Sequence, residues 1–375
     1  MPLMLVLVAG LAGLLAGAVP ASAQESSFSR AAALQQAGDL EGAAAEYRKF
    51  LAQHPSNVEA QSNLGVVLAH LGRYQEAITA YRQALERAPG NAAIRVNLGL
   101  ALYKTVQLVE AAEEFDRVLA VQPANLQARY LSADCRLQLG RPAEAVTLLE
   151  PLARTRPDDA ALAYLLGMAY LSSGAVDKGQ LLIDRILRHG DSAEARVLMG
   201  VAKRRAGELK EAVDDLGRAV ELNPKLPGVR GLYGQALLES GNPDLARAEL
   251  QAELAANPLD FDANLYLGVL LKGDGDDEAA LRHFNQALNV RPADIATRYQ
   301  IATVHLARQQ NAAATAMLEE IVKEAPKFIE AHVALATAYY RQQRKADGDR
   351  HKAIVDRLTR EEEAKGPKRR GSGGP

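Results

Sequence analysis

The sequence contains no tryptophan and only one cysteine, Cys135, among its 375 residues. Aromatic residues make up 5% of the chain, and 44 basic residues nearly balance 46 acidic ones, for a formal net charge of −2. A single cysteine excludes an intrachain disulfide, and its small neighbours favour a buried, inert thiol. The balanced charge argues against a general nucleic-acid-binding protein, which needs a net basic face.

The usual signatures of catalytic and metal sites are also missing. The seven histidines form no pair four residues apart and no spacing typical of metal ligands. The acidic run at residues 274–278 is similar in composition to a calcium loop, but Ala279 and Asn285 stand where such a loop needs glycine and glutamate. With no Gly-rich phosphate loop and no nucleophile elbow either, we expect a protein that is not an enzyme and has no cofactor, metal or small-molecule substrate.

What the sequence does contain is a repeat with a period of 34 residues. Nine repeats cover residues 24–328, eight of them 34 residues long and one 33, and a tenth, degenerate repeat starts at Ile329. A fixed period of this size is typical of solenoid proteins. Three columns of residues recur with this period: Gly65, Gly99, Gly167, Gly200, Gly234 and Gly268; Ala77, Ala111, Ala145, Ala212, Ala246 and Ala280; and Pro55, Pro89, Pro123, Pro157, Pro224, Pro258, Pro292 and Pro326.

Each repeat predicts a pair of short helices. In the repeat at residues 58–91, both halves have the apolar spacing of an amphipathic helix, Gly72 supplies the turn between them, and Pro89 ends the second helix. Gly65 and Ala77 are expected where the two helices cross, because only small residues let the backbones approach closely. Helices this short are marginal alone, so each pair must pack against the next, which predicts a solenoid.

These columns, together with the aromatic residues Tyr47, Tyr81, Phe115 and Phe284, resemble the tetratricopeptide repeat family. The resemblance covers residues 24 to about 345. It implies an all-α solenoid of about nine to ten helix-turn-helix repeats, wound as a right-handed superhelix. It also implies a concave groove, lined mainly by the first helix of each pair, that binds proteins or peptides.

The resemblance also indicates which residues should face the groove, because the family's inward-facing places are the second, fifth, ninth, twelfth and thirteenth of each repeat. We expect them to form an exposed apolar, tyrosine-lined surface for an extended partner segment. The alternative is that neighbouring first helices, or a segment of the same chain, cover them. The family's clamp for dicarboxylates needs asparagine at the ninth place, which this chain never has. The candidate groove residues are Val66, Leu100, Tyr103, Tyr130, Leu137, Tyr164, Met168, Leu171, Val197 and Val201.

The two ends of the chain differ from the repeats. Residues 1–23 predict a signal peptide, with an uncharged apolar run at residues 3–19 and a small-x-small cleavage site at residues 21–23. An uncut anchor is the alternative, since no Lys or Arg precedes the run. Residues 329–365 predict the degenerate tenth repeat and a polar capping helix, and residues 366–375 a disordered basic tail.

The middle of the chain departs from the repeat pattern. Pro151 interrupts a second helix, and the fifth repeat is one residue short and lacks its closing proline. Asp191 with Glu194 predicts a capping box that restarts the next helix. Residues 151–192 therefore predict either a joint where the solenoid changes curvature or harmless drift of the repeat.

These observations predict a non-enzymatic scaffold or adaptor, exported to the periplasm or secreted, that binds a protein or peptide partner. The alternative is an accessory subunit, peripherally associated with an envelope machine for secretion, outer-membrane assembly or polysaccharide export. Groove chemistry defines a class of ligand, so the sequence leaves the partner, the process and the oligomeric state open.

Overall fold

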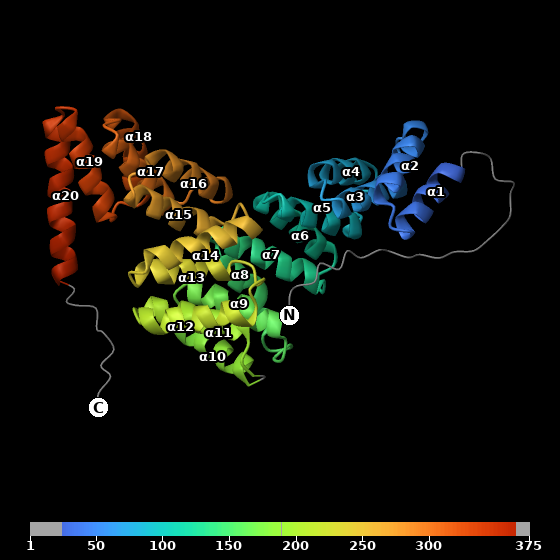
Figure 1. Ribbon diagram of the computed structural model, residues 1–375, viewed down its shortest axis with the longest axis horizontal. Helices are drawn as coiled ribbons and strands as arrows, with labels where there is room; N and C mark the ends of the chain where they lie inside the picture. The colour runs from blue at the N-terminus through green and yellow to red at the C-terminus, as the bar shows by residue number, and fades with distance from the viewer. Residues whose placement is uncertain (1–24, 189, 365–375) are drawn as a thin grey trace. The chain divides into compact units, whose positions relative to one another are not determined.

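The computed structural model describes residues 25–188 and 190–364, and these fold as an all-α solenoid with no strand (Figure 1). The predicted signal segment 1–23 and basic tail 366–375 lie outside the described residues. None of the helices between residues 25 and 364 is both long and apolar enough to cross a bilayer. The chain divides into two compact units, an N-terminal unit (Met1–Pro227) and a C-terminal unit (Gly228–Pro375).

The N-terminal unit holds six helix pairs, in which the odd-numbered helix is the first of each pair. Its elements are α1 (Glu25–Gln36), α2 (Leu40–Gln53), α3 (Val58–His70), α4 (Tyr74–Arg87), α5 (Ala92–Lys104), α6 (Leu108–Val121), α7 (Leu126–Gln138), α8 (Pro142–Leu149), the 3-10 helix η1 (Glu150–Leu152), α9 (Ala160–Ser172), α10 (Val176–Leu187), α11 (Ala193–Ala206) and α12 (Leu209–Leu222).

The C-terminal unit holds four pairs and ends on a longer helix. Its elements are α13 (Val229–Glu239), α14 (Pro243–Ala256), α15 (Phe261–Gly273), α16 (Asp277–Val290), α17 (Ile295–Ala307), α18 (Asn311–Glu324), α19 (Ile329–Arg341) and α20 (Lys345–Ala364).

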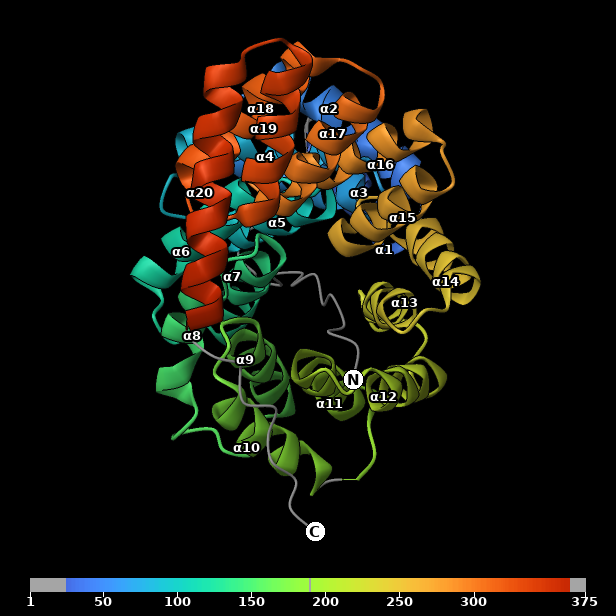
Figure 2. The same cartoon turned by 90° about the vertical axis from the view of Figure 1, so that its left-hand side faces the viewer.

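Within each unit, every first helix packs against its own second helix, and that second helix packs against the next first helix. Figure 2 shows this for α9 and α11, which lie side by side with α10 against both. Pro142 and Pro243 are the first residues of α8 and α14, where a missing N–H costs nothing. The predicted effect of Pro151 is confirmed, since α8 is only 8 residues long and gives way to η1.

The glycine column marks a close approach of the two helices of a pair at five of its six places, as expected, whereas Gly167 faces Leu198 of the next first helix, α11. A Cβ atom on Gly65 would lie 2.5 Å from the Tyr81 ring, and one on Gly99 would lie 2.6 Å from the Phe115 ring. Both rings are fully buried. The small residue and the large ring are therefore two halves of one packing contact.

In the third and fourth repeats, a polar contact ties the repeat to the one before it. The guanidinium of Arg95, the fourth residue of its repeat, donates to the carbonyl oxygen of Pro89 at 2.6 Å and to Glu114 Oε2 at 2.6 Å. Arg129 donates in the same way to the Pro123 carbonyl at 2.5 Å. The fourth residue thus satisfies an acceptor just past the end of the preceding second helix.

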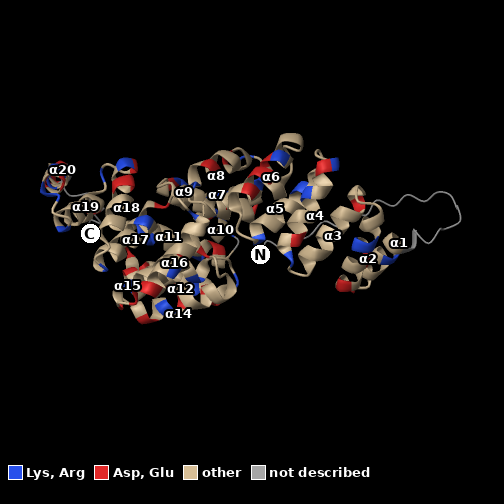
Figure 3. Ribbon diagram, turned by 90° about the horizontal axis from the view of Figure 1, so that it is seen from above, with Lys and Arg blue, Asp and Glu red and all other residues tan. Residues whose placement is uncertain are grey.

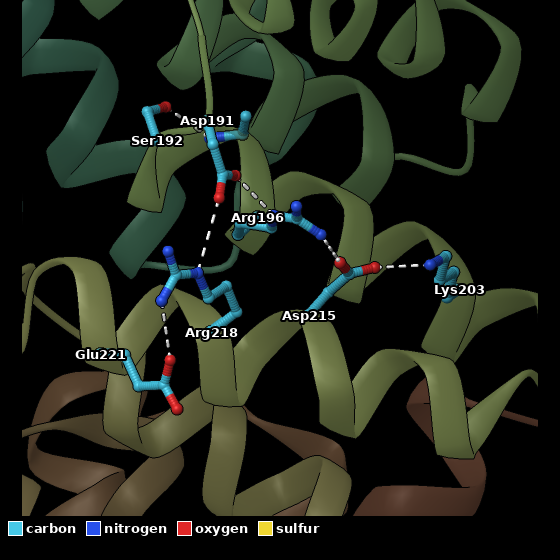
Figure 4. A network of polar contacts seen from close by, with 8 residues as sticks. Asp191, Ser192, Arg196, Lys203, Asp215, Arg218 and Glu221 are labelled. Carbon is cyan, nitrogen blue, oxygen red and sulfur yellow. Dashed lines mark hydrogen bonds and ion pairs between the residues drawn. The ribbon is translucent and has the colours of Figure 1, made fainter.

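The fifth repeat lacks the closing proline, and a carboxylate takes its place (Figure 4). Arg196 donates through Nε to Asp191 Oδ1 at 2.6 Å and through Nη1 to Asp215 Oδ1 at 2.7 Å. The predicted capping box is wrong here, because Ser192 is the N-cap of α11 and accepts from the Ala195 N–H. Asp191 lies one residue before this cap, and its carboxylate accepts from Arg196.

The division between the two compact units falls after Pro227 rather than within residues 151–192. Gly228 is the N-cap of α13 and has no side chain to cap it, whereas the Asn, Asp or Ser residues before α3, α5, α7, α9 and α11 each accept a backbone N–H. Glu253 of α14 substitutes, accepting the Gly228 N–H at 3.2 Å. The irregular sequence at 151–192 is therefore absorbed inside the N-terminal unit.

The turn between α5 and α6 gives a first testable prediction. Val106 has φ of 58° at the place where Gly72, Gly140 and Gly174 stand in neighbouring repeats. A β-branched residue in this left-handed region is strained by about 1–2 kcal/mol. We expect Val106→Gly to raise the free energy of unfolding by about 0.5–1 kcal/mol, because the greater chain entropy of glycine offsets part of the relief.

Urea unfolding followed by circular dichroism checks this result. The matched control is Val109→Gly, three residues later in the exposed first turn of α6, which should instead lose about 0.5–1 kcal/mol. A loss of stability in both variants would contradict the strain at Val106.

The C-terminal unit gives a prediction on pH. Burial raises the pKa of the Asp260 carboxyl to about 7, and repulsion from Asp262 and Glu253 adds to this rise. The hydrogen bond that Asp260 accepts from the Ala263 N–H acts in the opposite direction. An unfolded aspartate loses its proton near pH 3.9. The folded state thus holds more protons than the unfolded state between these values, and this carboxyl destabilises the unit as pH rises through that window.

We expect Asp260→Asn to be about 1–2 kcal/mol more stable than wild type at pH 8 and equal to it at pH 4. Asparagine keeps the cap on Ala263 but never ionises. Urea unfolding at both pH values measures the difference. A variant that loses stability at pH 8 would show that the charged carboxylate is favourable there.

Candidate binding surface

The first helices of the N-terminal unit place the predicted groove residues on one succession of helices, α3, α5, α7, α9 and α11. Five of these residues are half-buried and keep some accessible surface: Val66, Tyr103, Leu137, Tyr164 and Met168. They extend over α3, α5, α7 and α9. We call these five residues the first-helix face.

The other five predicted groove residues are buried, so the expectation that they are exposed was wrong: Leu100, Tyr130, Leu171, Val197 and Val201. The first helices approach one another, and α9 packs directly against both α7 and α11. The prediction assumed that neither the second helix of a repeat nor the next first helix could bury these places. Leu171 lies against Gly179 of α10, the second helix of its own repeat. The alternative, in which a neighbouring first helix covers the side chain, holds for Tyr130, whose hydroxyl reaches the start of α9.

Tyr130 illustrates how this burial is achieved. Its hydroxyl donates to Asp159 Oδ2 at 2.6 Å, while Oδ1 of the same carboxylate accepts the Leu162 N–H at the start of α9. Burial, followed by the hydrogen bond to Asp159, raises the pKa of Tyr130 above its usual range. Tyr130 therefore joins α7 to α9, and its hydroxyl is already used within the protein.

A polar group lies within this otherwise apolar face. The Tyr103 hydroxyl of α5 donates to Asp134 Oδ2 of α7 at 2.5 Å, and Gln138 Nε2 donates to the same oxygen at 2.8 Å. Burial raises the pKa of the Asp134 carboxyl, although both hydrogen bonds act to lower it. The sequence analysis named Tyr103 but not Asp134 or Gln138 as part of a site.

The C-terminal unit repeats this contact with different side chains. Gln235 Nε2 donates to the Tyr266 hydroxyl at 2.5 Å, and Lys272 Nζ donates to Thr303 Oγ1 at 3.2 Å. These two pairs, like Tyr103 and Asp134, are 31 residues apart. A polar pair at this spacing is the sequence signal that would have found the contact.

Charges on the N-terminal unit are largely paired within the protein. Lys203 donates to Asp215 Oδ2 at 2.6 Å, so the basic run at residues 203–205 is partly neutralised. Figure 3 shows basic and acidic residues interspersed along the helices of each unit. Within the described residues, charge of one sign therefore does not mark a binding site on its own.

Among the described residues, no group of three or more His, Cys, Asp or Glu side chains is placed to hold a metal. The acidic run at 274–278 has structural roles instead. Asp276 caps α16 by accepting the Ala279 N–H at 3.0 Å, and Asp274 accepts from Arg247 at 2.6 Å. Cys135 is a buried free thiol, and burial raises its pKa out of the reactive range.

Stacked helix pairs with a periodic glycine–aromatic contact define a helical-repeat solenoid. Models of the tetratricopeptide repeat match residues 28–226, 234–295 and 299–348, so the chain belongs to the tetratricopeptide repeat family. Proteins of this family are generally non-enzymatic scaffolds that bind other proteins. The helical architecture and the family predicted from the sequence are confirmed.

Individual similar proteins are more distant. The chain is 33% identical over 165 residues to the Vi polysaccharide export protein VexE of Salmonella typhi, covering 42% of this chain and 25% of that protein. It is 22% identical over 234 residues to the BBSome complex member BBS4 of Bos taurus, covering 53% of this chain and 45% of that protein. The chain thus spans less than half the length of these two relatives.

A solved structure, the APC/C hetero-tetramer Cut9–Hcn1, contains a chain with a similar fold. The TM-score is 0.60 at 15% sequence identity, over 89% of this chain and 73% of that one. At this identity the similarity shows the fold alone.

Proposed function

We propose that the N-terminal unit binds an extended segment of a partner protein along its first-helix face, and that the protein is a scaffold or adaptor of the cell envelope. The observation that carries this proposal is the succession of half-buried apolar and aromatic side chains on α3, α5, α7 and α9. The buried part of each side chain restricts its rotamers, so little side-chain entropy is lost when a partner covers the exposed part.

The geometry favours a mainly apolar partner segment. Leu137, Tyr164 and Met168 come from two adjacent first helices, α7 and α9, which pack against each other. Tyrosine and methionine adapt to apolar side chains of varied shape. The carboxylate of Asp134 is engaged by Tyr103 and Gln138, so it does not present an unpaired charge that a basic partner segment would require.

The envelope location is part of the proposal and rests on residues 1–23. Their uncharged apolar run and small-x-small site are the features of a cleaved signal peptide. Mass spectrometry of the protein from its native host checks this. A mature chain starting at Gln24 is expected, and a chain from the membrane fraction that still starts at Met1 would favour an anchor.

A second candidate function is an accessory role in polysaccharide export. The 33% identity to the Vi polysaccharide export protein VexE over 165 residues favours it. In that case the partner on the first-helix face would be a component of the export machine. Deleting the gene in its native host should then reduce the polysaccharide at the cell surface, whereas loss of a general adaptor should leave it unchanged.

Site-specific photocrosslinking in cells tests the binding surface. A photoreactive residue would replace Tyr164 or Met168 on α9, one at a time, because both keep accessible surface. The matched control is Leu181 on α10, the second helix of the same repeat, whose side chain is 66% exposed. We expect one dominant protein adduct from the α9 positions and none from Leu181.

The other outcomes also decide the matter. Equal adducts from Leu181 and from the α9 positions would show nonspecific contact, and would contradict the proposal that the first-helix face is the binding surface. Adducts only within the chain itself would mean that the protein covers its own first-helix face. If the dominant adduct contains a component of the export machine, it supports the accessory role in polysaccharide export. If it contains a soluble protein, it supports the adaptor.

A further inference from the structure

The four turns that join first to second helices in the C-terminal unit separate charges of opposite sign. The turn at residues 239–245 has two acidic residues and no basic one, and the turn at 273–279 has four acidic residues and no basic one. The turn at 307–313 has one basic residue and no acidic one, and the turn at 341–347 has three basic residues and one acidic one. We call these four turns, in this order, the turn edge.

Contacts between neighbouring helix pairs hold the four turns in order. Arg247, just after the first turn, donates to Asp274 Oδ2 in the second turn at 2.6 Å. Lys272, just before the second turn, donates to α17, as described above. Arg341 of the fourth turn donates through Nη1 to the carbonyl oxygen of Leu306, just before the third turn, at 2.6 Å. The acidic turns therefore occupy one half of the edge and the basic turns the other half.

Charged side chains in both halves are accessible to a partner. Asp244 in the first turn and Arg308 in the third are exposed, and neither forms an ion pair with another described residue. The side chains of Glu278 in the second turn and Lys345 in the fourth are 82% and 80% exposed, and each pairs with a residue four positions later in its own helix. Such exposed pairs are weak, so both side chains can turn toward a partner's charge.

A large apolar side chain is exposed at each end of the turn edge. Leu245, in the first turn of α14, is 58% exposed, and Tyr340, in the last turn of α19, is 40% exposed. Interfaces between proteins commonly place apolar and aromatic side chains among polar ones. Each end of the edge thus offers an apolar contact, with acidic residues around Leu245 and basic residues around Tyr340.

We propose that the turn edge is a self-complementary surface that binds a second copy of this chain about a two-fold axis. In such a contact the same surface serves on both copies, and each pair of touching residues occurs twice. An axis between the second and third turns sets the first turn of each copy against the fourth turn of the other, and the second against the third. Acidic turns then meet basic turns throughout, and Leu245 of each copy meets Tyr340 of the other.

The order of charges favours a second copy over other partners. A uniformly acidic partner is repelled by the first two turns, and a uniformly basic partner by the last two. A partner that suits both halves needs the opposite order of charges over the same length, which a rotated copy of the edge has. The equivalent turns of the second to sixth repeats each hold equal numbers of acidic and basic residues, so this separation of charge belongs to the C-terminal unit.

Analytical ultracentrifugation of the whole chain, as isolated from cells, tests the proposal. We expect a reversible dimer in about 0.1 M salt, and a dissociation constant at least about tenfold higher in about 1 M salt, where charges are screened beyond about 3 Å. A chain that remains monomeric at about 0.2 mM in the lower salt would overturn the proposal. A dimer that is equally tight in both salts would place the contact outside the turn edge.

Two double variants test which turns meet. One is Asp244→Lys with Glu278→Lys, and the other is Arg308→Glu with Lys345→Glu. Each variant alone sets like charges against each other and should dimerise at least about tenfold more weakly than wild type. In an equimolar mixture the new lysines of one variant face the new glutamates of the other, so a heterodimer of near wild-type affinity should form. Folded variants that stay monomeric when mixed would contradict the two-fold arrangement.

Glu320→Lys with Asp356→Lys is the matched control. Both residues are exposed, and they lie on α18 and α20 toward the ends away from the turn edge. This variant changes the net charge by the same amount as Asp244→Lys with Glu278→Lys, and it should dimerise like wild type. Loss of the dimer here would show that net charge, and not the order of charges along the edge, controls association.

Discussion

Replacing Phe115 with alanine is expected to lower the free energy of unfolding of the N-terminal unit by about 3–5 kcal/mol. The ring is fully buried and fills the space that Gly99 leaves where α5 and α6 approach each other. Removing it deletes a large apolar surface and leaves a cavity that the two backbones close only in part. Urea unfolding followed by circular dichroism measures the loss.

The partner of Phe115 provides a sharper test through a double-mutant cycle. Gly99→Val alone should cost about 1–3 kcal/mol, because a Cβ atom at residue 99 would lie 2.6 Å from the Phe115 ring. Combined with Phe115→Ala, the valine side chain has the vacated space to occupy. The double variant should therefore lose less than the sum of the single losses, by at least about 1 kcal/mol.

Gly90→Val is the control for this cycle. A Cβ atom on Gly90 would meet nothing within 4 Å, so the substitution should change stability by less than about 0.5 kcal/mol and add simply to Phe115→Ala. Simple additivity of Gly99→Val with Phe115→Ala would show that the glycine column reflects something other than the ring beneath it.

Asp215→Ala is expected to cost about 2–3 kcal/mol. The carboxylate side chain is 4% exposed and accepts from Arg196 at 2.7 Å and Lys203 at 2.6 Å. Without it, Lys203 and Arg196 both lose this carboxylate, although Arg196 keeps its ion pair with Asp191. The side chains of Arg196 and Lys203 are 30% and 31% exposed, so solvent screens both charges. We therefore expect a smaller loss of stability than for a fully buried ion pair.

Asp191→Ala is the matched control, since Asp191 contacts the same Arg196 but its side chain is 37% exposed. It should lose less than about 1 kcal/mol, and 1 M salt should remove most of that loss while leaving the effect of Asp215→Ala. Arg196 and Arg218 hold the pKa of Asp191 below its usual value, so its contribution is present near neutral pH and is lost as the pH falls through that lowered pKa. Equal losses at both aspartates would contradict the role of burial.

The sequence predicted those features that depend on one repeat alone. Periodic apolar residues predicted the helix pairs, and Gly65 predicted close packing, because each depends on neighbours a few positions away or within one pair. These signals recur in nearly every repeat, so drift in a single copy does not hide them.

The sequence did not predict the features that depend on how one repeat meets the next. The burial of Val197 and Leu171 depends on how closely the neighbouring helices pack, which periodicity does not report. The cap of α11 is Ser192, and the neighbouring Asp191 accepts from Arg196 in the next helix. Arg95 and Glu114 are 19 residues apart, a spacing that carries meaning only once the places that face each other within a repeat are known.

The contact between a closing proline and the fourth residue of the following repeat has a consequence for how the gene can change in length. If residues 92–125 were deleted or duplicated as a block, a proline carbonyl would again face an arginine, because Pro89 and Pro123 precede Arg95 and Arg129 at the same distance. At Arg196 the contact uses Asp191, and at Gly228 the cap comes from Glu253 in the next helix. Gain and loss of whole repeats by unequal recombination should therefore be tolerated early in the chain and selected against around residues 191 and 228.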